Sequence, residues 1–260
     1  MIRSSIFAIH TRYHRGLLIP CATLTASLLV ISLPSTTLHA MPGTLAFDIR
    51  QTISSSATQT DRERHRPRIV AFGDSLTAGF GVSQDQAYPS QLEGKLTSLG
   101  YDYEVVNAGV SGETTAGGLR RVGWILKSKP QLVVLELGGN DGLRGLSVTE
   151  TRANLDAIIR SLKDAQVQVV LAGMKLPPNY GEEYTKAFEA IYRELATRHH
   201  LPFIPFFLEG VGGRSGLNQA DGIHPTAEGH RIIAETVLQT LRPLLNRSHG
   251  SGEAVQKKKA

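Results

Sequence analysis

The chain has 260 residues, of which 41% are hydrophobic and 20% are charged, as in an average globular protein. This composition excludes a wholly disordered chain, a collagen-like chain and a polytopic membrane protein. The formal net charge of +5 is concentrated at the two ends of the chain, and residues 41–245 have a net charge of about −1. A basic nucleic-acid-binding surface is therefore not expected on the body of the protein.

The first 40 residues have the pattern of an export signal. A basic segment precedes an apolar run at 17–33, and Ala40 follows as a small residue at which cleavage can occur. We expect residues 1–40 to be a cleaved signal peptide and the protein to be periplasmic or secreted. If the segment is not cleaved, it would instead anchor the protein in the inner membrane.

The only cysteine, Cys21, lies inside this apolar run. A disulfide within the chain, a Cys-rich zinc site and a cysteine nucleophile in the body of the protein are therefore excluded. Residues 41–66 are polar and without periodicity, and we expect a flexible linker there. Residues 247–260 are predicted to form a disordered basic tail, which leaves 67–246 as the folded domain.

Within 67–246, short apolar runs rich in Val, Ile and Leu alternate with longer segments of helical periodicity. Strands are expected at 68–73, 103–107, 131–138, 167–173 and 201–207. Helices are expected near 89–99, 119–127, 148–165, 182–199 and 226–241. Continuous apolar runs are typical of parallel strands that are buried on both faces. The pattern predicts an α/β fold, a three-layer α/β/α sandwich with a five-stranded, mainly parallel sheet.

Polar, glycine-rich segments follow these strands, where ligands bind in open α/β sheets. The first is GDSLTAG at 73–79. A serine at a strand-to-helix turn, here Ser75, can expose its Oγ among small neighbours that let a substrate approach. The alternative is that Ser75 merely caps the following helix.

Two further segments offer hydrogen-bond donors for an oxyanion. NAGVSGETT follows the second strand, and a glycine in such a loop can present an unobstructed backbone N–H. ELGGNDGLRG spans the end of the third strand, and the Asn140 amide is a neutral donor of the type that stabilises a developing alkoxide. Taken alone, each segment is equally explained as an ordinary turn.

Near the C-terminus, DGIHP places Asp221 and His224 three residues apart on one turn. The carboxylate can then hold His Nδ1 while Nε2 takes a proton from a serine. Metal ligation is an alternative, although this pair has no obvious third ligand, and helix capping is another. Together, the four segments supply every part of an acyl-transfer site.

The blocks GDSLTAG, NAGVSGETT, ELGGNDGLRG and DGIHP resemble the signature blocks of the SGNH (GDSL) hydrolase superfamily, in the same order and at the same spacing. The resemblance covers about residues 68–245 and is closest to the bacterial periplasmic group described as acyl-CoA thioesterase, arylesterase and lysophospholipase. It implies the flavodoxin-like version of the three-layer fold. It also implies a hydrolase of carboxylic ester and thioester bonds in acyl substrates, lysophospholipids among them.

Carried over by motif, the resemblance makes Ser75 the nucleophile, His224 the general base and then acid, and Asp221 the residue that orients His224. It builds an oxyanion hole from the N–H of Ser75, the N–H of Gly112 and the side chain of Asn140. Asp74 belongs to the signature but is not expected to take part in the chemistry.

The segment after the fourth predicted strand is the expected wall of an acyl groove, because its two prolines limit its conformations. Its members are Leu176, Pro177, Pro178, Asn179 and Tyr180. We expect no metal, no cofactor and no obligate protein partner, and a monomer. Two alternatives remain: an O-acetyl esterase acting on cell-wall or capsular carbohydrate, and a non-enzymatic scaffold, which the intact motifs disfavour.

Overall fold

The computed structural model describes residues 66–246, so the predicted signal peptide, nearly all of the predicted linker and the predicted tail lie outside the described residues. Five parallel strands form one sheet in the order β2-β1-β3-β4-β5. Their bounds are β1 Arg68–Gly73, β2 Glu104–Gly109, β3 Leu132–Glu136, β4 Gln168–Ala172 and β5 Phe203–Ile204. The predicted α/β class and parallel sheet are confirmed, and the strand order is the flavodoxin-like one.

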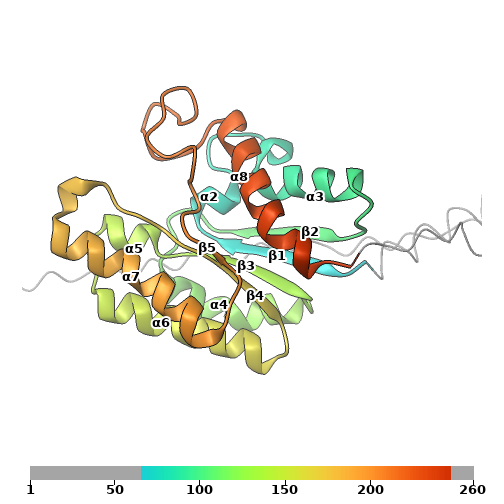
Figure 1. Cartoon of the computed structure of the whole chain (residues 1–260), viewed down its shortest axis with the longest axis horizontal. Helices are drawn as coiled ribbons and strands as arrows, with labels where there is room; N and C mark the ends of the chain where they lie inside the picture. The colour runs from blue at the N-terminus through green and yellow to red at the C-terminus, as the bar shows by residue number, and fades with distance from the viewer. Residues whose placement is uncertain (1–65, 247–260) are drawn as a thin grey trace, which may run out of the picture. The chain divides into compact units, whose positions relative to one another are not determined.

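Helices cover both faces of the sheet, which gives the three predicted layers (Figure 1). One layer holds α3 (Tyr88–Ser98) and α8 (Ala227–Leu241), which pack against each other. The opposite layer holds α4 (Thr115–Lys127), α6 (Val148–Asp164) and α7 (Glu182–His199), with α6 in contact with both neighbours. Among the described helices, none is both long enough and apolar enough to cross a bilayer.

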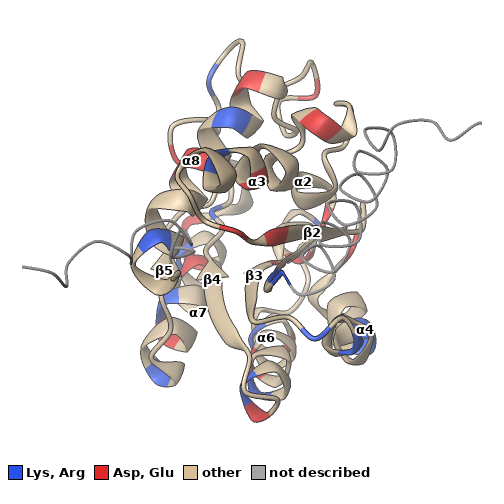
Figure 2. Ribbon diagram, turned by 90° about the vertical axis from the view of Figure 1, so that its right-hand side faces the viewer, with Lys and Arg blue, Asp and Glu red and all other residues tan. Residues whose placement is uncertain are grey.

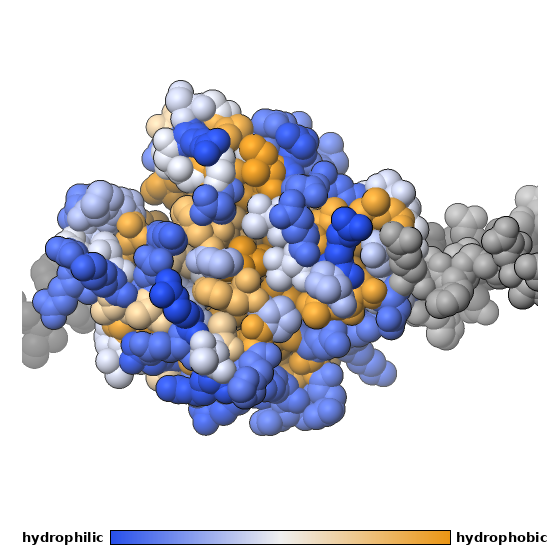
Figure 3. Space-filling view, in the orientation of Figure 1, coloured by the Kyte–Doolittle hydropathy of each residue, from blue (hydrophilic) through white to orange (hydrophobic). Residues whose placement is uncertain are grey.

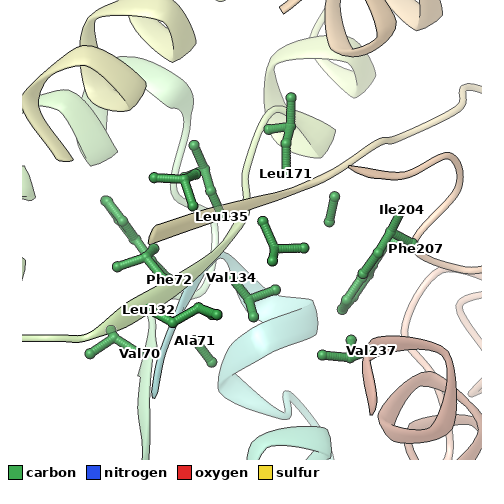
Figure 4. Packing of buried hydrophobic residues seen from close by; sticks show 14 of the residues in the cluster. Val70, Ala71, Phe72, Leu132, Val134, Leu135, Leu171, Ile204, Phe207 and Val237 are labelled. Atoms are coloured by element: carbon green, nitrogen blue, oxygen red, sulfur yellow. The ribbon is translucent and has the colours of Figure 1, made fainter. Parts of the chain in front are cut away.

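The core forms on both faces of the central strands because these strands consist almost entirely of apolar residues. Phe72, Leu135 and Leu171 extend from neighbouring strands toward the α4–α6–α7 layer (Figure 4). Phe207 and Val237 contribute to the opposite face, and all of these side chains are fully buried. Charged residues of both signs are interspersed on the helices, and the strands contain few of them (Figure 2).

Two predicted elements differ from the structure. The strand predicted at 201–207 has only two residues, because Pro202 and Pro205 lack the N–H that a longer ladder requires. Helix α4 begins at Thr115, before the first predicted residue, and the Thr114 side chain accepts the N–H of Gly117 as its cap. Two consecutive glycines in its first turn hide this start from an analysis of apolar periodicity.

Short elements complete the described chain. They are the helices α2 (Ser75–Ala78) and α5 (Gly139–Leu143) and the 3-10 turns η1 (Gln84–Gln86), η2 (Pro178–Tyr180) and η3 (Arg242–Leu244). Both short helices follow directly from strands. Because β1 lies between β2 and β3, the loops after these three strands emerge side by side at one edge of the sheet. The strand order reverses there, and ligands bind at such an edge in open α/β sheets.

Candidate active site

Ser75 is the first residue of α2 and follows β1 after a single residue. The cap of this helix is Asp74, whose Oδ1 accepts the N–H of Leu76 at 3.0 Å. Ser75 is therefore not the helix cap, which was the alternative explanation for this serine. Its side chain instead lies 2.9 Å from His224, measured from Oγ to Nε2.

The Asp221–His224 pair is built by a local turn between β5 and α8. His224 Nδ1 lies 2.6 Å from Asp221 Oδ2, and Asp221 Oδ1 accepts the N–H groups of Ile223 and His224 at 2.9 and 3.0 Å. These hydrogen bonds, led by the one from the imidazole, lower the pKa of the exposed Asp221 to about 2. The carboxylate is therefore ionised at neutral pH. Thr226, not Asp221, caps α8.

Gly112 and Asn140 lie after β2 and β3, on either side of the Ser75 loop. Gly112 is exposed, and its φ of +78° belongs to the left-handed region that favours glycine. Arg144 joins the two positions, since its Nη2 donates to the Gly112 carbonyl at 3.0 Å and lies 3.5 Å from Asn140 Oδ1. Asn140 Nδ2 donates to Asp74 Oδ2 at 3.0 Å. The amide nitrogen of Asn140 is thus directed toward the Ser75 loop.

A buried acidic pair lies beneath the serine. Glu136 is fully buried, and its Oε2 accepts the Thr77 hydroxyl at 2.8 Å and the Asp74 N–H at 3.4 Å. Burial raises the pKa of Glu136 well above its ordinary value. Burial also raises the pKa of Asp74 to about 6, against the opposing hydrogen bonds from Leu76 and Asn140. Glu136 was not among the predicted site residues, although a glutamate in an otherwise apolar strand is a visible signal in the sequence.

The close packing of this pair leaves no room for a side chain at Gly73. A Cβ there would lie 2.1 Å from Thr77 Oγ1 and 2.6 Å from the Glu136 carbonyl oxygen. The glycine that precedes Asp74 is thus required by close approach to β3.

The predicted groove wall lies against α5, the helix that carries Asn140. The Tyr180 hydroxyl donates to the Leu143 carbonyl at 3.0 Å, and Leu176 packs beside Gly142. The three residues between them are exposed: Pro177, Pro178 and Asn179. The segment therefore borders the site, and contact with an acyl chain stays a prediction.

Taken together, the geometry is that of a hydroxyl nucleophile with its base. The Ser75 hydroxyl faces an imidazole nitrogen, and the other ring nitrogen is held by an ionised carboxylate. Such an arrangement can move a proton from the hydroxyl to the imidazole as the oxygen attacks a carbonyl carbon. Asn140, with Gly112 nearby on a neighbouring loop, supplies neutral hydrogen-bond donors of the kind that stabilise an oxyanion.

Comparison with known proteins supports this assignment. Residues 71–232 match the model of the GDSL-like Lipase/Acylhydrolase family. The esterase TesA of Pseudomonas aeruginosa is 45% identical over 178 residues, covering 68% of this chain and 89% of that protein. Thioesterase 1/protease 1/lysophospholipase L1 of Escherichia coli K12 is 41% identical over 179 residues, covering 68% of this chain and 85% of that protein. A crystal structure of TesA superposes with a TM-score of 0.67 at 45% identity, covering 68% of this chain and 99% of the other.

Proposed function

The chain belongs to the GDSL-like lipase/acylhydrolase family, the SGNH hydrolases, and we propose that it cleaves acyl esters and thioesters through a covalent intermediate on Ser75. It is an ester hydrolase, as the resemblance of its four sequence blocks implied. The observation that carries the proposed mechanism is the continuous contact from Asp221 through His224 to Ser75, with distances of 2.6 and 2.9 Å.

In the first step, Ser75 Oγ attacks the acyl carbonyl carbon while His224 Nε2 takes the hydroxyl proton. Asp221 stays ionised, keeps the remaining ring proton on Nδ1 and stabilises the imidazolium that forms. The imidazolium then gives its proton to the leaving alcohol or thiol, and the acyl group remains on Ser75. Water, activated by the same imidazole, releases the carboxylic acid and restores the serine.

The tetrahedral intermediate carries a negative oxygen that requires donors. In this proposal the donors are the N–H of Ser75, the N–H of Gly112 and Nδ2 of Asn140. Arg144 supports the arrangement because its Nη2 contacts both the Gly112 backbone carbonyl oxygen and the Asn140 side-chain oxygen Oδ1, which joins the two donor positions. Neutral donors are suited to this work because they stabilise the developing charge without binding an anionic product tightly.

Exposed apolar side chains near the site favour an acyl substrate. Phe80 is 51% exposed, and its ring contacts the ring of His224. Ile223, which precedes His224 in the chain, is 44% exposed. Val110, two residues before Gly112, is 47% exposed. On the face of the protein shown in Figure 3, apolar and hydrophilic surface areas lie side by side. A hydrocarbon chain that covers such surface gains about 25 cal/mol per Å² of apolar area removed from water.

We also propose that the protein acts after export, in the periplasm or outside the cell, or on the inner membrane if residues 1–40 stay attached. This part rests on the basic and apolar pattern of those residues alone. The proposed substrates are small molecules with an acyl ester or thioester bond, including lysophospholipids. The protein is proposed to act as a monomer.

The test is hydrolysis of p-nitrophenyl esters from acetate to palmitate by the full chain, with Ser75→Ala as the control. We expect turnover to increase beyond acetate and to vanish in the variant. Turnover confined to acetate would favour the O-acetyl esterase. Equal turnover in Ser75→Ala would overturn the proposed mechanism, and no turnover by either protein would overturn the proposed function.

A further inference from the structure

The loop between β5 and α8 supplies both Asp221 and His224 but contains no helix or strand. The contacts within the pair come from the local turn, so they fix how the two side chains meet each other. They do not fix where the pair lies relative to Ser75, which is 149 positions away from His224 in the chain. That distance also depends on contacts between the two segments.

Gln219 makes such a contact. Its side-chain Nε2 donates to the Phe80 carbonyl at 2.7 Å and to the Pro225 carbonyl at 2.9 Å. Its backbone N–H donates to the His224 carbonyl at 2.7 Å. Phe80 in turn donates its backbone N–H to the Ser75 carbonyl at 3.1 Å. A chain of hydrogen bonds thus runs from the nucleophile to the base, beside the direct contact between them.

Two further observations show that the Phe80 segment and the His224 turn are in close contact. The Phe80 ring lies 4.6 Å from the His224 ring, centroid to centroid, at an interplanar angle of 41°. At Gly81, φ is +79° and an added Cβ would lie 2.1 Å from Gln219 Oε1. Because Gly81 has no side chain, the Gln219 amide can occupy the space beside the backbone after Phe80.

We propose that Gln219 is a positioning residue, whose amide sets the distance between His224 Nε2 and Ser75 Oγ by joining Phe80 to the His224 turn. The role rests on the proposed function. A glutamine suits it because one NH2 group can donate to two carbonyl oxygens at once. Misplacement of a catalytic group by about 1 Å can lower turnover by about 10²-fold. Loss of the amide therefore acts through His224, on kcat.

The first experiment is Gln219→Leu, which removes both donors and keeps much of the side-chain volume. We expect kcat for p-nitrophenyl butyrate to fall by about 10- to 100-fold, with KM within about threefold of the wild type. The matched control is Gln91→Leu. Gln91 Nε2 also donates to two carbonyls, those of Gln86 at 2.7 Å and Ala227 at 3.3 Å, but joins α3 to the start of α8. The kcat of Gln91→Leu should stay within about twofold of the wild-type value.

A second variant covers the case in which Gln219→Leu does not fold. Gln219→Glu keeps the outline of the side chain, but at pH 8 its carboxylate can donate to neither carbonyl. We expect the same loss of kcat. Wild-type kcat in Gln219→Glu, or in a folded Gln219→Leu, would overturn the positioning role.

A double-mutant cycle separates positioning from a general structural effect. In a His224→Ala background, Gln219→Leu should cause no further loss of the residual hydrolysis, because the base that it positions is already gone. An equal further loss in both backgrounds would overturn the proposal. The two proposals fail differently: a wild-type chain that cleaves no ester overturns both, whereas an active wild type with an equally active Gln219 variant overturns only the positioning role.

Discussion

The two ends of the Ser75–His224 contact are held in different ways. Ser75 is 9% exposed, follows the interior strand β1 and lies above a buried network of Asp74, Thr77 and Glu136. His224 is half-buried in an irregular loop, and its partner Asp221 is exposed. The proposed nucleophile is therefore positioned by the same packing that folds the sheet, and the proposed base by a few polar contacts near the surface. Substitutions in the packing beneath Ser75 should change stability, and those in the His224 loop should change turnover.

His224→Ala tests the surface half of this comparison. Loss of the proposed general base should lower kcat for p-nitrophenyl esters by about 10⁴-fold or more. The midpoint of thermal unfolding should change little, since truncation of a half-buried loop side chain leaves no cavity in the core. Steady-state kinetics and a thermal melt measure the two effects. A large fall in Tm would mean that the His224 loop is part of the cooperative core after all.

Asn140→Ala should lower kcat by about 10²- to 10³-fold, which leaves a slow but measurable enzyme, because it removes one donor from the proposed oxyanion hole. Asn154→Ala is the matched control. The Asn154 amide donates to Thr115 Oγ1 at 3.2 Å, in a network on the helical layer, and its loss should leave kcat within about twofold. An unchanged rate in the Asn140 variant would remove this residue from the mechanism.

Gly73→Ala tests the buried half. The added methyl group would meet the Thr77 hydroxyl and the backbone of β3, so we expect a loss of about 3 kcal/mol in the free energy of unfolding. Gly94, in the middle of α3, has nothing within 4 Å of an added Cβ. Gly94→Ala should therefore stabilise the protein by about 0.5–1 kcal/mol. Urea unfolding measures the free energy of unfolding of both variants. Equal values for the two variants would contradict the close packing beneath Ser75.

The two regions should also differ in how their acidic groups make stability depend on pH. The pKa of Asp74 is raised from 3.8 to about 6, so the folded chain binds this proton more tightly than the unfolded chain. The free energy of unfolding should therefore fall by about 1–2 kcal/mol as pH rises from 4 to 6. Asp74→Asn should reduce that slope in urea unfolding, and the remaining slope should come from Glu136, whose pKa burial also raises.

Asp221 provides the contrast for the same experiment. Its pKa is lowered to about 2, so its contribution to stability is present above its ordinary pKa and is lost only as the pH falls toward 2. Asp221→Asn should leave the slope between pH 4 and 6 unchanged. A slope that follows Asp221 instead of Asp74 would reverse the comparison.

Local patterns in the sequence were sufficient for the fold class, and with the family resemblance they predicted the residues of the candidate site. Apolar runs predicted the parallel strands, and the polar segments that follow them predicted which loops meet at the edge of the sheet. The reason is geometric, because parallel strands with crossover helices place all their carboxyl ends on one side. Ser75, Asn140 and the Asp221–His224 turn could therefore be brought together before any distance was known.

Tertiary structure decided what depends on contacts between distant segments. The last strand has only two residues because of its prolines, and Glu136 is buried beneath Ser75. Arg144 lies between Gly112 and Asn140 and contacts both. Tertiary structure also brought Gln219 to the Phe80 carbonyl, 139 positions away. Such contacts leave no periodic signal, because a single glutamine or arginine in a polar loop looks the same whether it faces water or another loop. Sequence by itself thus predicted the groups that we propose to react, and packing between loops decided how they are held in place.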